Sequence, residues 1–479
     1  MTEQDLYMLS PLLLLAGASV LVMLLIAMNL THRKIQVFTL ILFLFSFISL
    51  YFIGTDLPHE IGTLLRVDGL AVFITGLILF ASLVVNILSY IYFEEREEGP
   101  REYYVLLLLA TLGACVLAAS THFVSFFLGL EILTVALYAL IAYLRERHHP
   151  VEAGVKYLIL AAFSSAFLLF GMGLVYLEAG TMNFAEIAGR LGRAESFPVL
   201  AVAGTGMMLV GIGFKLAIVP FHLWAADVYQ GAPAPITAFI ATASKAGVLA
   251  VLLRFTTAVQ GMGSETLMVI FVCIAMASMV IGNLLALQQT NVKRILAYSS
   301  IAHMGYLLVA LISGSSSGNQ AITFYLVTYV LSTLIAFGVV TLLSSRQEDA
   351  GDIALYRGLF WRNPVLAAFF TASLLSLAGI PLTAGFIGKF YILSAAAGSG
   401  EWGGGVILVL SSVIGLYYYL RIITAMFAER ELPESEGRRT HPLFYLFSSV
   451  TLTLVTFLVV WLGVSPAGLL EFMTGLTGR

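Results

Sequence analysis

Long apolar segments, separated by short polar or charged stretches, follow one another along almost the whole chain. A helix needs about 20 apolar residues to cross the hydrocarbon core of a bilayer. The pattern therefore predicts fourteen membrane-spanning helices, at approximately 9–30, 35–54, 68–93, 102–119, 123–144, 153–177, 199–228, 235–257, 266–288, 293–313, 319–345, 363–396, 404–427 and 441–463. Their apolar runs are continuous rather than alternating, which argues against a β-barrel. The expected fold class is an all-α polytopic membrane protein.

Composition and charge agree with this fold. The chain has 479 residues, of which 60% are hydrophobic and 11% charged, and its mean hydropathy is +0.97. A soluble protein carries about 25% charged residues, so a soluble globular protein is excluded. The net charge of -3 is too balanced for a nucleic-acid-binding surface. Acidic residues precede the first apolar segment and no cleavage site follows it, so that segment is expected to remain as a membrane helix.

The basic residues of the loops are unequally distributed between the two sides of the membrane. One side holds Arg33, Lys34, Arg96, Arg101, Arg145, Arg147, Lys293, Arg294, Arg346, Arg357, Arg362, Arg430, Arg438 and Arg439, and the other holds Arg66, Arg190, Arg193, Arg254 and Arg479. Lysine and arginine are retained on the cytoplasmic side during insertion. Both termini are therefore expected on the periplasmic side of a bacterial inner membrane, which an even number of crossings requires.

Four lysines fall inside predicted helices, namely Lys156, Lys215, Lys245 and Lys389. An unpaired charge at the bilayer centre costs about 2.5 to 3.5 kcal/mol on insertion scales. Glu131 is the one carboxylate deep in a predicted helix, so it cannot pair with all four. A proton relay is therefore favoured for Lys215, Lys245 and Lys389. Lys156 lies near the start of its helix, where a structural ion pair or an interfacial position is an equal alternative.

Two histidines, and the absence of metal-binding or catalytic motifs, also favour proton transfer. His222 and His303 lie in apolar segments, where each could pass protons or simply bond a backbone carbonyl. Burial favours a neutral lysine and a nearby carboxylate favours a charged one, so moving the partner switches proton affinity. No metal-ligand cluster, phosphate-binding glycine motif or catalytic nucleophile is recognisable, and Cys115 and Cys273 are expected to pack in the core. Redox chemistry is not expected in this chain.

Two of the predicted helices are too long and contain glycine and proline beside a lysine. Pro220 follows Lys215, and Pro381 precedes Lys389, which predicts two broken helices of the kind that mark ion sites in transporters. An offset near 173 residues maps Lys215 onto Lys389 and Glu131 onto His303. Each repeat holds five crossings, an odd number, so the second copy must be inverted. The expected units are 1–100, 101–259, 260–430 and 431–479, with three helices, two inverted five-helix repeats and a final helix.

Four stretches are specific enough to suggest a family. They are FKLAIVPFHLW at 214–224, DVYQGAPAPITAFIATASK at 227–245, NVKRILAYSSIAHMGY at 291–306 and GIPLTAGFIGKF at 379–390. Together with Glu131 they closely resemble the N-subunit family of proton-pumping NADH:quinone oxidoreductase, respiratory complex I. This antiporter-like family is related to the large subunits of multi-subunit (Mrp) sodium/proton antiporters. Ala226 departs from the resemblance, which leads us to expect proline there.

The resemblance implies a proton-translocating, non-redox subunit of a translocase in an electron transport chain. The parent complex would use NADH, FMN, iron–sulfur clusters and quinone, with no cofactor or metal in this chain. Its partners would be neighbouring antiporter-like and small membrane subunits and the lipid bilayer, and no nucleic acid. By motif, Glu131 and Lys215 would form a coupled pair, Lys245 a bridge, His303 a central relay and Lys389 the exit-side carrier, with Lys156, His222 and Lys293 as accessory residues.

Lys389 also favours the N type over the M type, which typically has glutamate there, and the short C-terminus lacks the lateral helix of the L type. Two other functions stay open on the residues. The chain could be an ion-exchanging subunit of a sodium/proton antiporter or of a membrane-bound hydrogenase. It could also be a structural spacer whose buried charges only fix helix packing.

Overall fold

The long apolar helices are present as predicted. The computed structural model describes residues 2–53, 57–96, 100–191, 198–259, 265–429 and 442–477. Thirteen helices in these ranges are long and apolar enough to cross a membrane, and the predicted crossing at 363–396 is made by two shorter apolar helices. The crossings are α2 (Ser10–Ala27), α3 (His32–Ile53), α4 (Gly69–Glu94), α5 (Glu102–Ala119), α6 (Phe123–Ile141), α7 (His148–Ala179), α9 (Val199–Leu216) with α10 (Leu223–Gly231), α11 (Ala234–Phe239) with α12 (Lys245–Val259), α13 (Glu265–Leu287), α14 (Val292–Ile312), α15 (Ser316–Leu343), α17 (Pro364–Ala378) with α18 (Ala384–Gly398), α19 (Trp402–Phe427) and α20 (Pro442–Val464).

Several short elements were not predicted, because they are too brief or too polar to show an apolar period. They are α1 (Glu3–Met8), an antiparallel hairpin of β1 (His59–Ile61) and β2 (Leu65–Val67), α8 (Phe184–Leu191), a π-helical turn η1 (Ile240–Ser244), a 3₁₀ turn η3 (Ile353–Tyr356), α16 (Leu359–Arg362) and α21 (Ala467–Thr477).

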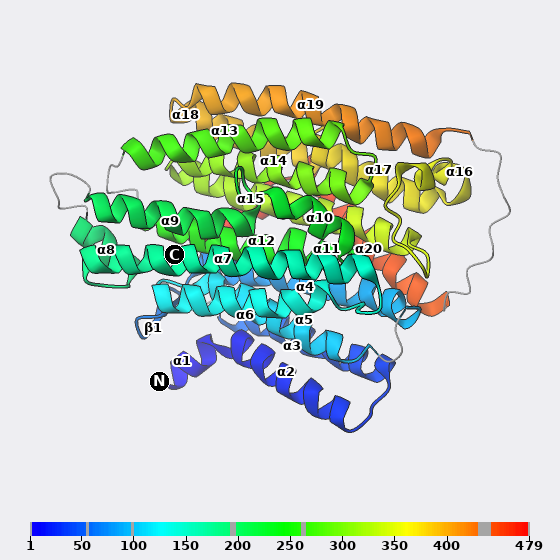
Figure 1. The fold of residues 1–479 in the computed structure, drawn as a ribbon, viewed down its shortest axis with the longest axis horizontal. Helices are drawn as coiled ribbons and strands as arrows, with labels where there is room; N and C mark the ends of the chain where they lie inside the picture. The colour runs from blue at the N-terminus through cyan, green and yellow to red at the C-terminus, as the bar shows by residue number, and fades with distance from the viewer. Residues whose placement is uncertain are drawn as a thin grey trace.

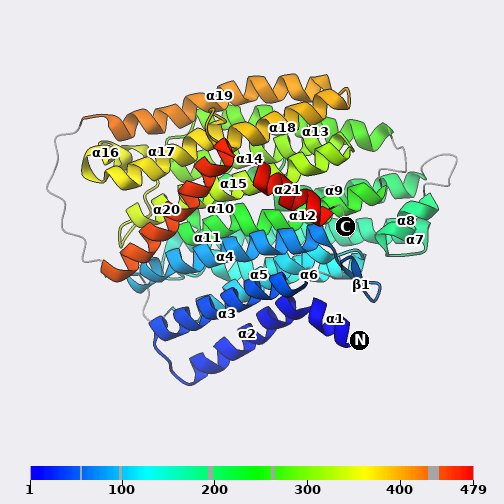
Figure 2. The ribbon, with the colours of Figure 1, turned by 180° about the vertical axis from the view of Figure 1, so that it is seen from behind.

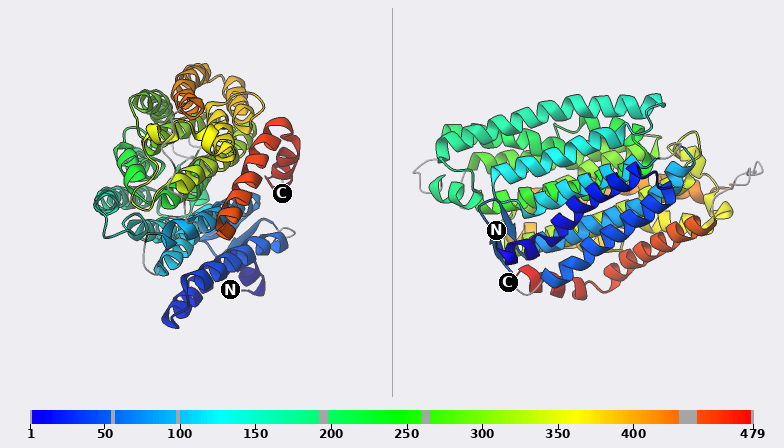
Figure 3. Two further views of the ribbon diagram at one scale, coloured as in Figure 1. Left: turned by 90° about the vertical axis from the view of Figure 1, so that its right-hand side faces the viewer. Right: turned by 90° about the horizontal axis from the view of Figure 1, so that it is seen from below.

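The long helices lie side by side, and both chain termini are at the same end of the bundle (Figures 1 and 2). We call this end the termini face; it also carries the β1–β2 hairpin and α8, whereas α16 lies at the opposite face (Figure 3). The loops that carry the described members of the larger basic group, from Arg33 to Arg362, lie at the opposite face. Arg193, Arg430, Arg438, Arg439 and Arg479 lie outside the described residues.

Helix contacts repeat along the chain in the way that two five-helix units require. In the first set α5 packs on α6 and α12, and α7 packs on α9. In the second set α13 packs on α14 and α19, and α15 packs on α17 and α18. The two sets meet through α14 and α15, which are almost completely enclosed. The boundaries 101–259 and 260–430 stay a prediction.

The two broken helices differ in where their lysine stands. Helix α9 ends at Leu216 and is followed by Ala217 in the left-handed conformation, so Lys215 precedes its break. Helix α17 ends at Ala378 and is followed by the left-handed Gly379, so Lys389 follows its break, inside α18. The left-handed residues are 162 positions apart, whereas the lysines are 174 apart. The predicted offset therefore does not place Lys215 and Lys389 at equivalent backbone positions.

Glycines allow the helices of the first set to approach closely. A Cβ atom on Gly113 of α5 would lie 2.5 Å from the backbone nitrogen of Leu133 and 2.7 Å from the carbonyl oxygen of Gly129, both in α6. A Cβ atom on Gly247 of α12 would lie 2.7 Å from the Ala114 carbonyl oxygen of α5. Small residues at such contacts let membrane helices pack backbone to backbone. Helices α5, α6 and α12 are therefore held together by main-chain contact.

We expect Gly113→Val to destabilise the bundle by at least about 1 to 3 kcal/mol, because the contacted atoms are backbone and cannot turn away. The melting temperature of the purified protein in detergent measures this. Gly173→Val in α7 is the matched control, since a Cβ atom there meets nothing within 4 Å. Equal melting temperatures for the two variants would contradict the assignment of close helix contact at Gly113.

Candidate functional site

Most of the candidate residues are enclosed by the bundle. Buried side chains are those of Lys215, His222, Lys245, Lys293, His303 and Lys389. Glu131 is half-buried, and Lys156 is exposed. Among the described residues, Lys215, Lys245 and Lys389 have no carboxylate partner within 4.0 Å. Their hydrogen-bond partners therefore decide what these three ammonium groups can do.

Lys215 bonds to hydroxyl groups. Its Nζ donates to Thr134 Oγ1 at 2.5 Å and to the Tyr157 hydroxyl at 3.2 Å. Glu131 stands three residues before Thr134 on α6 and accepts a hydrogen bond from Ser165 at 2.6 Å instead. Residues three apart on a helix share a face. The expected Glu131–Lys215 pair is therefore not formed in this conformation, and Lys215 is bonded one turn away from the carboxylate.

Lys245 lies directly after the π-helical turn η1, at the first residue of α12. Its Nζ donates to Ser300 of α14, and the Tyr229 ring lies beneath it with 6.0 Å between Nζ and the ring centroid. The hydroxyl groups of Tyr229 and Ser300 are 3.5 Å apart. Short π-helical segments often occur at functional sites. Ser300 thus connects Lys245 to α14.

His303 is enclosed by tyrosines. Its Nδ1 is hydrogen-bonded to the Tyr325 hydroxyl at 2.6 Å, and its Nε2 to the Tyr419 hydroxyl at 3.2 Å. The Tyr306 ring meets the imidazole edge to face, with 5.4 Å between centroids. The sequence left open whether His303 bonds a backbone carbonyl group. Both of its ring nitrogens instead bond tyrosine hydroxyl groups.

Lys389 bonds to the end of the broken helix. Its Nζ donates to the carbonyl oxygens of Leu377 at 3.1 Å and Ala378 at 2.8 Å, which the end of α17 leaves without helical partners. Its Nζ is 5.1 Å from the centroid of the Tyr306 ring. A Cβ atom on Gly379 would lie 2.8 Å from Lys389 Cδ, so the side chain fills the space beside the break. Discontinuous helices hold cations in this way in transporters.

Helix α14 contributes to the contacts of Lys245, His303 and Lys389. Ser300, His303 and Tyr306 are spaced by three residues, and Lys293 is seven residues before Ser300. These spacings place the side chains along one side of the helix. The sequence analysis named Lys293 and His303 but missed Ser300, Tyr306, Tyr325 and Tyr419. Helical spacing from His303 could have found Ser300 and Tyr306, whereas Tyr325 and Tyr419 come from other helices.

Lys293 is not the loop residue that was expected. It is buried in the first turn of α14, where its Nζ donates to the Ala232 carbonyl oxygen at 2.6 Å and to Asp349 Oδ2 at 2.6 Å. Tyr92 donates to Asp349 Oδ1 at 2.7 Å. Burial raises the pKa of Asp349, but the charge and hydrogen bond of Lys293 bring it below the ordinary value. The Asp349 carboxylate is therefore ionised at neutral pH.

Lys156 belongs to a chain of ion pairs on the outer surface. Its Nζ lies 2.9 Å from Glu152 Oε1 and 2.9 Å from Asp227 Oδ2, and Arg294 Nη1 lies 2.8 Å from Asp227 Oδ1. The Lys156 side chain is 45% exposed in the isolated chain. The ion pair that the sequence left open is therefore present, and an accessory role for Lys156 stays a prediction.

The remaining candidates have simpler surroundings. His222 is the residue before α10, and its buried Nδ1 has no hydrogen-bond partner in the described part of the chain. Ala226 is buried in the first turn of α10, where alanine continues the helix. Cys115 is buried, but Cys273 is exposed on α13, which corrects its assignment to the core.

One possible metal-ligand group was missed, because its residues share a turn rather than a recognisable motif. His148, His149 and Glu152 bring ligand atoms within 4.8 Å of one another at the start of α7. All three are exposed, and Glu152 is already paired with Lys156.

This fold and this site define a helical membrane protein that encloses titratable side chains between two broken helices. Residues 120–415 match the family described as NADH:quinone oxidoreductase/Mrp antiporter, transmembrane. The chain belongs to this family. The predicted antiporter-like resemblance is thereby confirmed at the level of the family.

Solved structures with this fold come from three kinds of complex. A chain of respiratory complex I from Thermus thermophilus, with bound aureothin, is 34% identical with a TM-score of 0.82, and the match covers 96% of this chain and 98% of that chain. A chain of the membrane-bound sulfane sulfur reductase (MBS), an archaeal respiratory membrane complex, is 25% identical with a TM-score of 0.84, over 98% and 96%. A chain of the Mrp complex from Dietzia sp. DQ12-45-1b shares the fold at 21% identity and a TM-score of 0.87, over 100% and 97%. This chain is thus an antiporter-like membrane subunit of the complex I, Mrp or MBS type.

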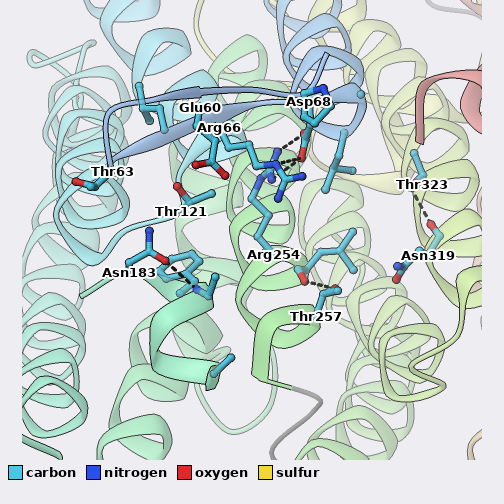
Figure 4. A pocket seen from close by; sticks show the side chains of 18 of the residues that line it. Glu60, Thr63, Arg66, Asp68, Thr121, Asn183, Arg254, Thr257, Asn319 and Thr323 are labelled. Carbon is cyan, nitrogen blue, oxygen red and sulfur yellow. Dashed lines mark hydrogen bonds and ion pairs between the residues drawn. The ribbon is translucent and has the colours of Figure 1, made fainter. Parts of the chain in front are cut away.

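A cleft of about 920 Å³ lies at the termini face, away from the candidate lysines (Figure 4). The β1–β2 hairpin, α8, the end of α12 and the start of α15 line it. Arg254 of α12 donates to Asp68 at 2.9 and 2.5 Å and to the Ala118 carbonyl oxygen at 2.8 Å. Asp68 also caps α4 by accepting from the Ala71 backbone nitrogen at 2.9 Å. The pair therefore ties α4, α5 and α12 together below the cleft.

Asp68→Asn should lower the melting temperature at pH 7, because removing one member of a largely buried pair costs up to about 3 to 5 kcal/mol. Burial raises the pKa of Asp68, but Arg254 lowers it below the ordinary value. The stabilisation is therefore present at neutral pH and is lost as the pH falls below the ordinary carboxyl value of about 3.9.

Melting curves of wild type and variant from pH 7 to pH 3 measure this effect. Glu60→Gln is the control, since Glu60 lines the same cleft and has no ion pair in the described ranges. A difference in melting temperature between wild type and Asp68→Asn that stays constant down to pH 3 would contradict the assignment.

Proposed function

We propose that this chain is a proton-translocating, N-type subunit in the membrane arm of NADH:quinone oxidoreductase. The observation that carries the proposal is the buried series Lys245, Ser300, His303, Tyr306 and Lys389. A hydrogen bond links Lys245 to Ser300, and the Tyr306 ring contacts both His303 and Lys389, which bonds to the end of a broken helix. NADH oxidation and quinone reduction, with FMN and iron–sulfur clusters, would take place in other subunits. This chain would hold no redox cofactor and would contact neighbouring antiporter-like and small subunits.

The orientation is part of the proposal. Basic residues gather at the opposite face, so that face would be cytoplasmic and both termini would lie on the periplasmic side of a bacterial inner membrane. Lys389, in the position where M-type relatives typically have glutamate, supports the N type.

Proton movement would begin with a change of partner at Lys215. Its ammonium group is now held by Thr134 and Tyr157, one turn from Glu131. A rotation toward Glu131 would favour the charged form, and a return to neutral hydroxyl groups would favour release of the proton. Lys245 would pass the proton through Ser300 to His303, and Lys389 would release it after the tyrosine cluster.

A purely structural role fits the buried lysines poorly. Three ammonium groups without a carboxylate partner within 4.0 Å among the described residues are expensive in a membrane, where apolar side chains would pack at no such cost. Without a fixed counter-ion, burial makes it easier for a lysine to lose its proton. The enclosure of Lys215, Lys245 and Lys389 therefore supports transport over a spacer.

Isolation of the complex tests the assignment. The chain, tagged and extracted in mild detergent, should migrate with NADH:quinone oxidoreductase activity in a very large complex. A smaller complex that lacks this activity, under conditions that keep a reference complex I intact, would instead indicate an antiporter or hydrogenase assembly. Sodium-dependent proton exchange in vesicles without NADH would favour the antiporter.

Lys215→Ala should abolish or strongly reduce proton pumping by the assembled complex in vesicles, since the switched ammonium group is lost. Pumping is measured as acidification per NADH oxidised. Wild-type pumping by a fully assembled variant would show that Lys215 is not part of the relay.

Thr134→Val should slow pumping by roughly tenfold, because a hydrogen bond to a charged group contributes about 1.5 to 3 kcal/mol. The fold is expected to survive, since valine has nearly the same shape. Thr111→Val is the control: Thr111 is equally buried, and it bonds to Leu107 and Ser82 away from any lysine. A similar effect of both substitutions would argue against a specific role of Thr134.

A further inference from the structure

Asp349 is an acidic residue that contacts the first turn of α14 at the opposite face. It stands in the loop between α15 and η3, its side chain is 15% exposed, and its Oδ2 is 2.6 Å from Lys293 Nζ. Lys293 is 1% exposed. Asp349 therefore reaches solvent at this face, whereas Lys293 lies in the interior.

The loop that carries Asp349 is held by three side chains, Tyr92, Arg96 and Arg147. Arg96 donates to the Ser345 carbonyl oxygen and stacks on Tyr92, whose hydroxyl group donates to Asp349. Arg147 donates to the carbonyl oxygens of Arg346 at 2.7 Å and Gln347 at 2.8 Å. Helices α4 and α7 thus hold the Asp349 carboxylate over the start of α14.

Polar groups continue inward from Lys293. Its ammonium group also donates to the carbonyl oxygen of Ala232, the residue that follows α10. Thr237 donates to the carbonyl oxygens of Tyr229 at 3.2 Å and Ala232 at 3.4 Å, and the Tyr229 hydroxyl lies 3.5 Å from Ser300. Lys293 and Ser300 are seven residues apart on the same side of α14, about 10 Å along its axis. The C-terminal part of α10 lies beside this interval. Its Tyr229 hydroxyl group reaches Ser300, which is the hydrogen-bond partner of Lys245.

We propose that Asp349 and Lys293 form a proton-uptake site that feeds the centre of the relay from the cytoplasmic side, without passing through Lys215. This inference rests on the proposed function. Lys293 gives a proton inward toward Ser300 and Lys245 and becomes neutral. The Asp349 carboxylate takes a proton from water, passes it to the neutral Lys293 and is again ionised. One proton has moved inward and the pair is restored.

A structural ion pair and an uptake site respond differently to neutralisation. When only one member of a buried pair is neutralised, the other is left as an uncompensated charge, whereas removing both charges often restores stability. A purely structural pair should therefore be rescued by neutralising both residues. An uptake site should not, because the double variant has no group to carry the proton.

The test uses the intact complex in vesicles, with pumping normalised to NADH oxidation by an artificial acceptor as a measure of assembled complex. We expect Asp349→Asn to reduce pumping about tenfold or more, and Asp349→Glu to retain most of it. The double variant Asp349→Asn with Lys293→Met should stay as low as the single variant.

Asp352→Asn is the matched control. Asp352 lies in the same loop and is exposed, and it caps η3 by accepting from the Ala354 nitrogen at 2.9 Å, which asparagine can also do. Wild-type pumping by Asp349→Asn, or its recovery in the double variant, would overturn the proposal. If Lys215→Ala also pumped normally in the same vesicles, the proposed function itself would fail; impairment by Lys215→Ala alone would leave that function standing without this uptake site.

Discussion

An ammonium group enclosed by membrane helices must find its hydrogen-bond acceptors inside the protein. Lys215 finds hydroxyl groups on α6 and α7, Lys245 finds Ser300, and Lys389 finds the carbonyl oxygens at the end of α17. A continuous helix has no free carbonyl group in its interior, so the break after α17 is what allows Lys389 to be buried. Placement of breaks and hydroxyl groups thus follows from the need to hold three cations away from lipid.

The same need explains why α14 is central. It contributes Lys293, Ser300, His303 and Tyr306, and it is enclosed by helices of both five-helix sets. Neutral hydroxyl and imidazole groups can pass a proton without adding a second fixed charge. A helix that the bundle encloses almost completely therefore carries the groups between the lysines.

Much of the fold could be predicted from the sequence, because a bilayer imposes helix length and apolarity together. The α5 boundaries were predicted at 102–119, as observed, and both breaks were indicated by glycine and proline beside a lysine. The surface elements lack an apolar period and were missed. Contacts across the bundle were also out of reach: sequence spacing gave no sign that Thr134 rather than Glu131 bonds Lys215, or that Asp349 pairs with Lys293. The assignment of Lys293 to a loop failed because a charge near a helix end cannot by itself be placed inside or outside.

The backbone contacts at Gly113 and Gly247 set a limit on how the exchange of partners proposed for Lys215 could occur. Helices α5, α6 and α12 contact one another main chain to main chain. Helix α6 therefore cannot slide or rotate without separating these three helices. Glu131 and Thr134 are both carried by α6 and move as one body. The exchange of partners proposed for Lys215 would then come from rotamer changes of the lysine and glutamate side chains, and not from a movement of α6 past its neighbours. Its timing would be set by the electric field of neighbouring charges rather than by mechanical movement.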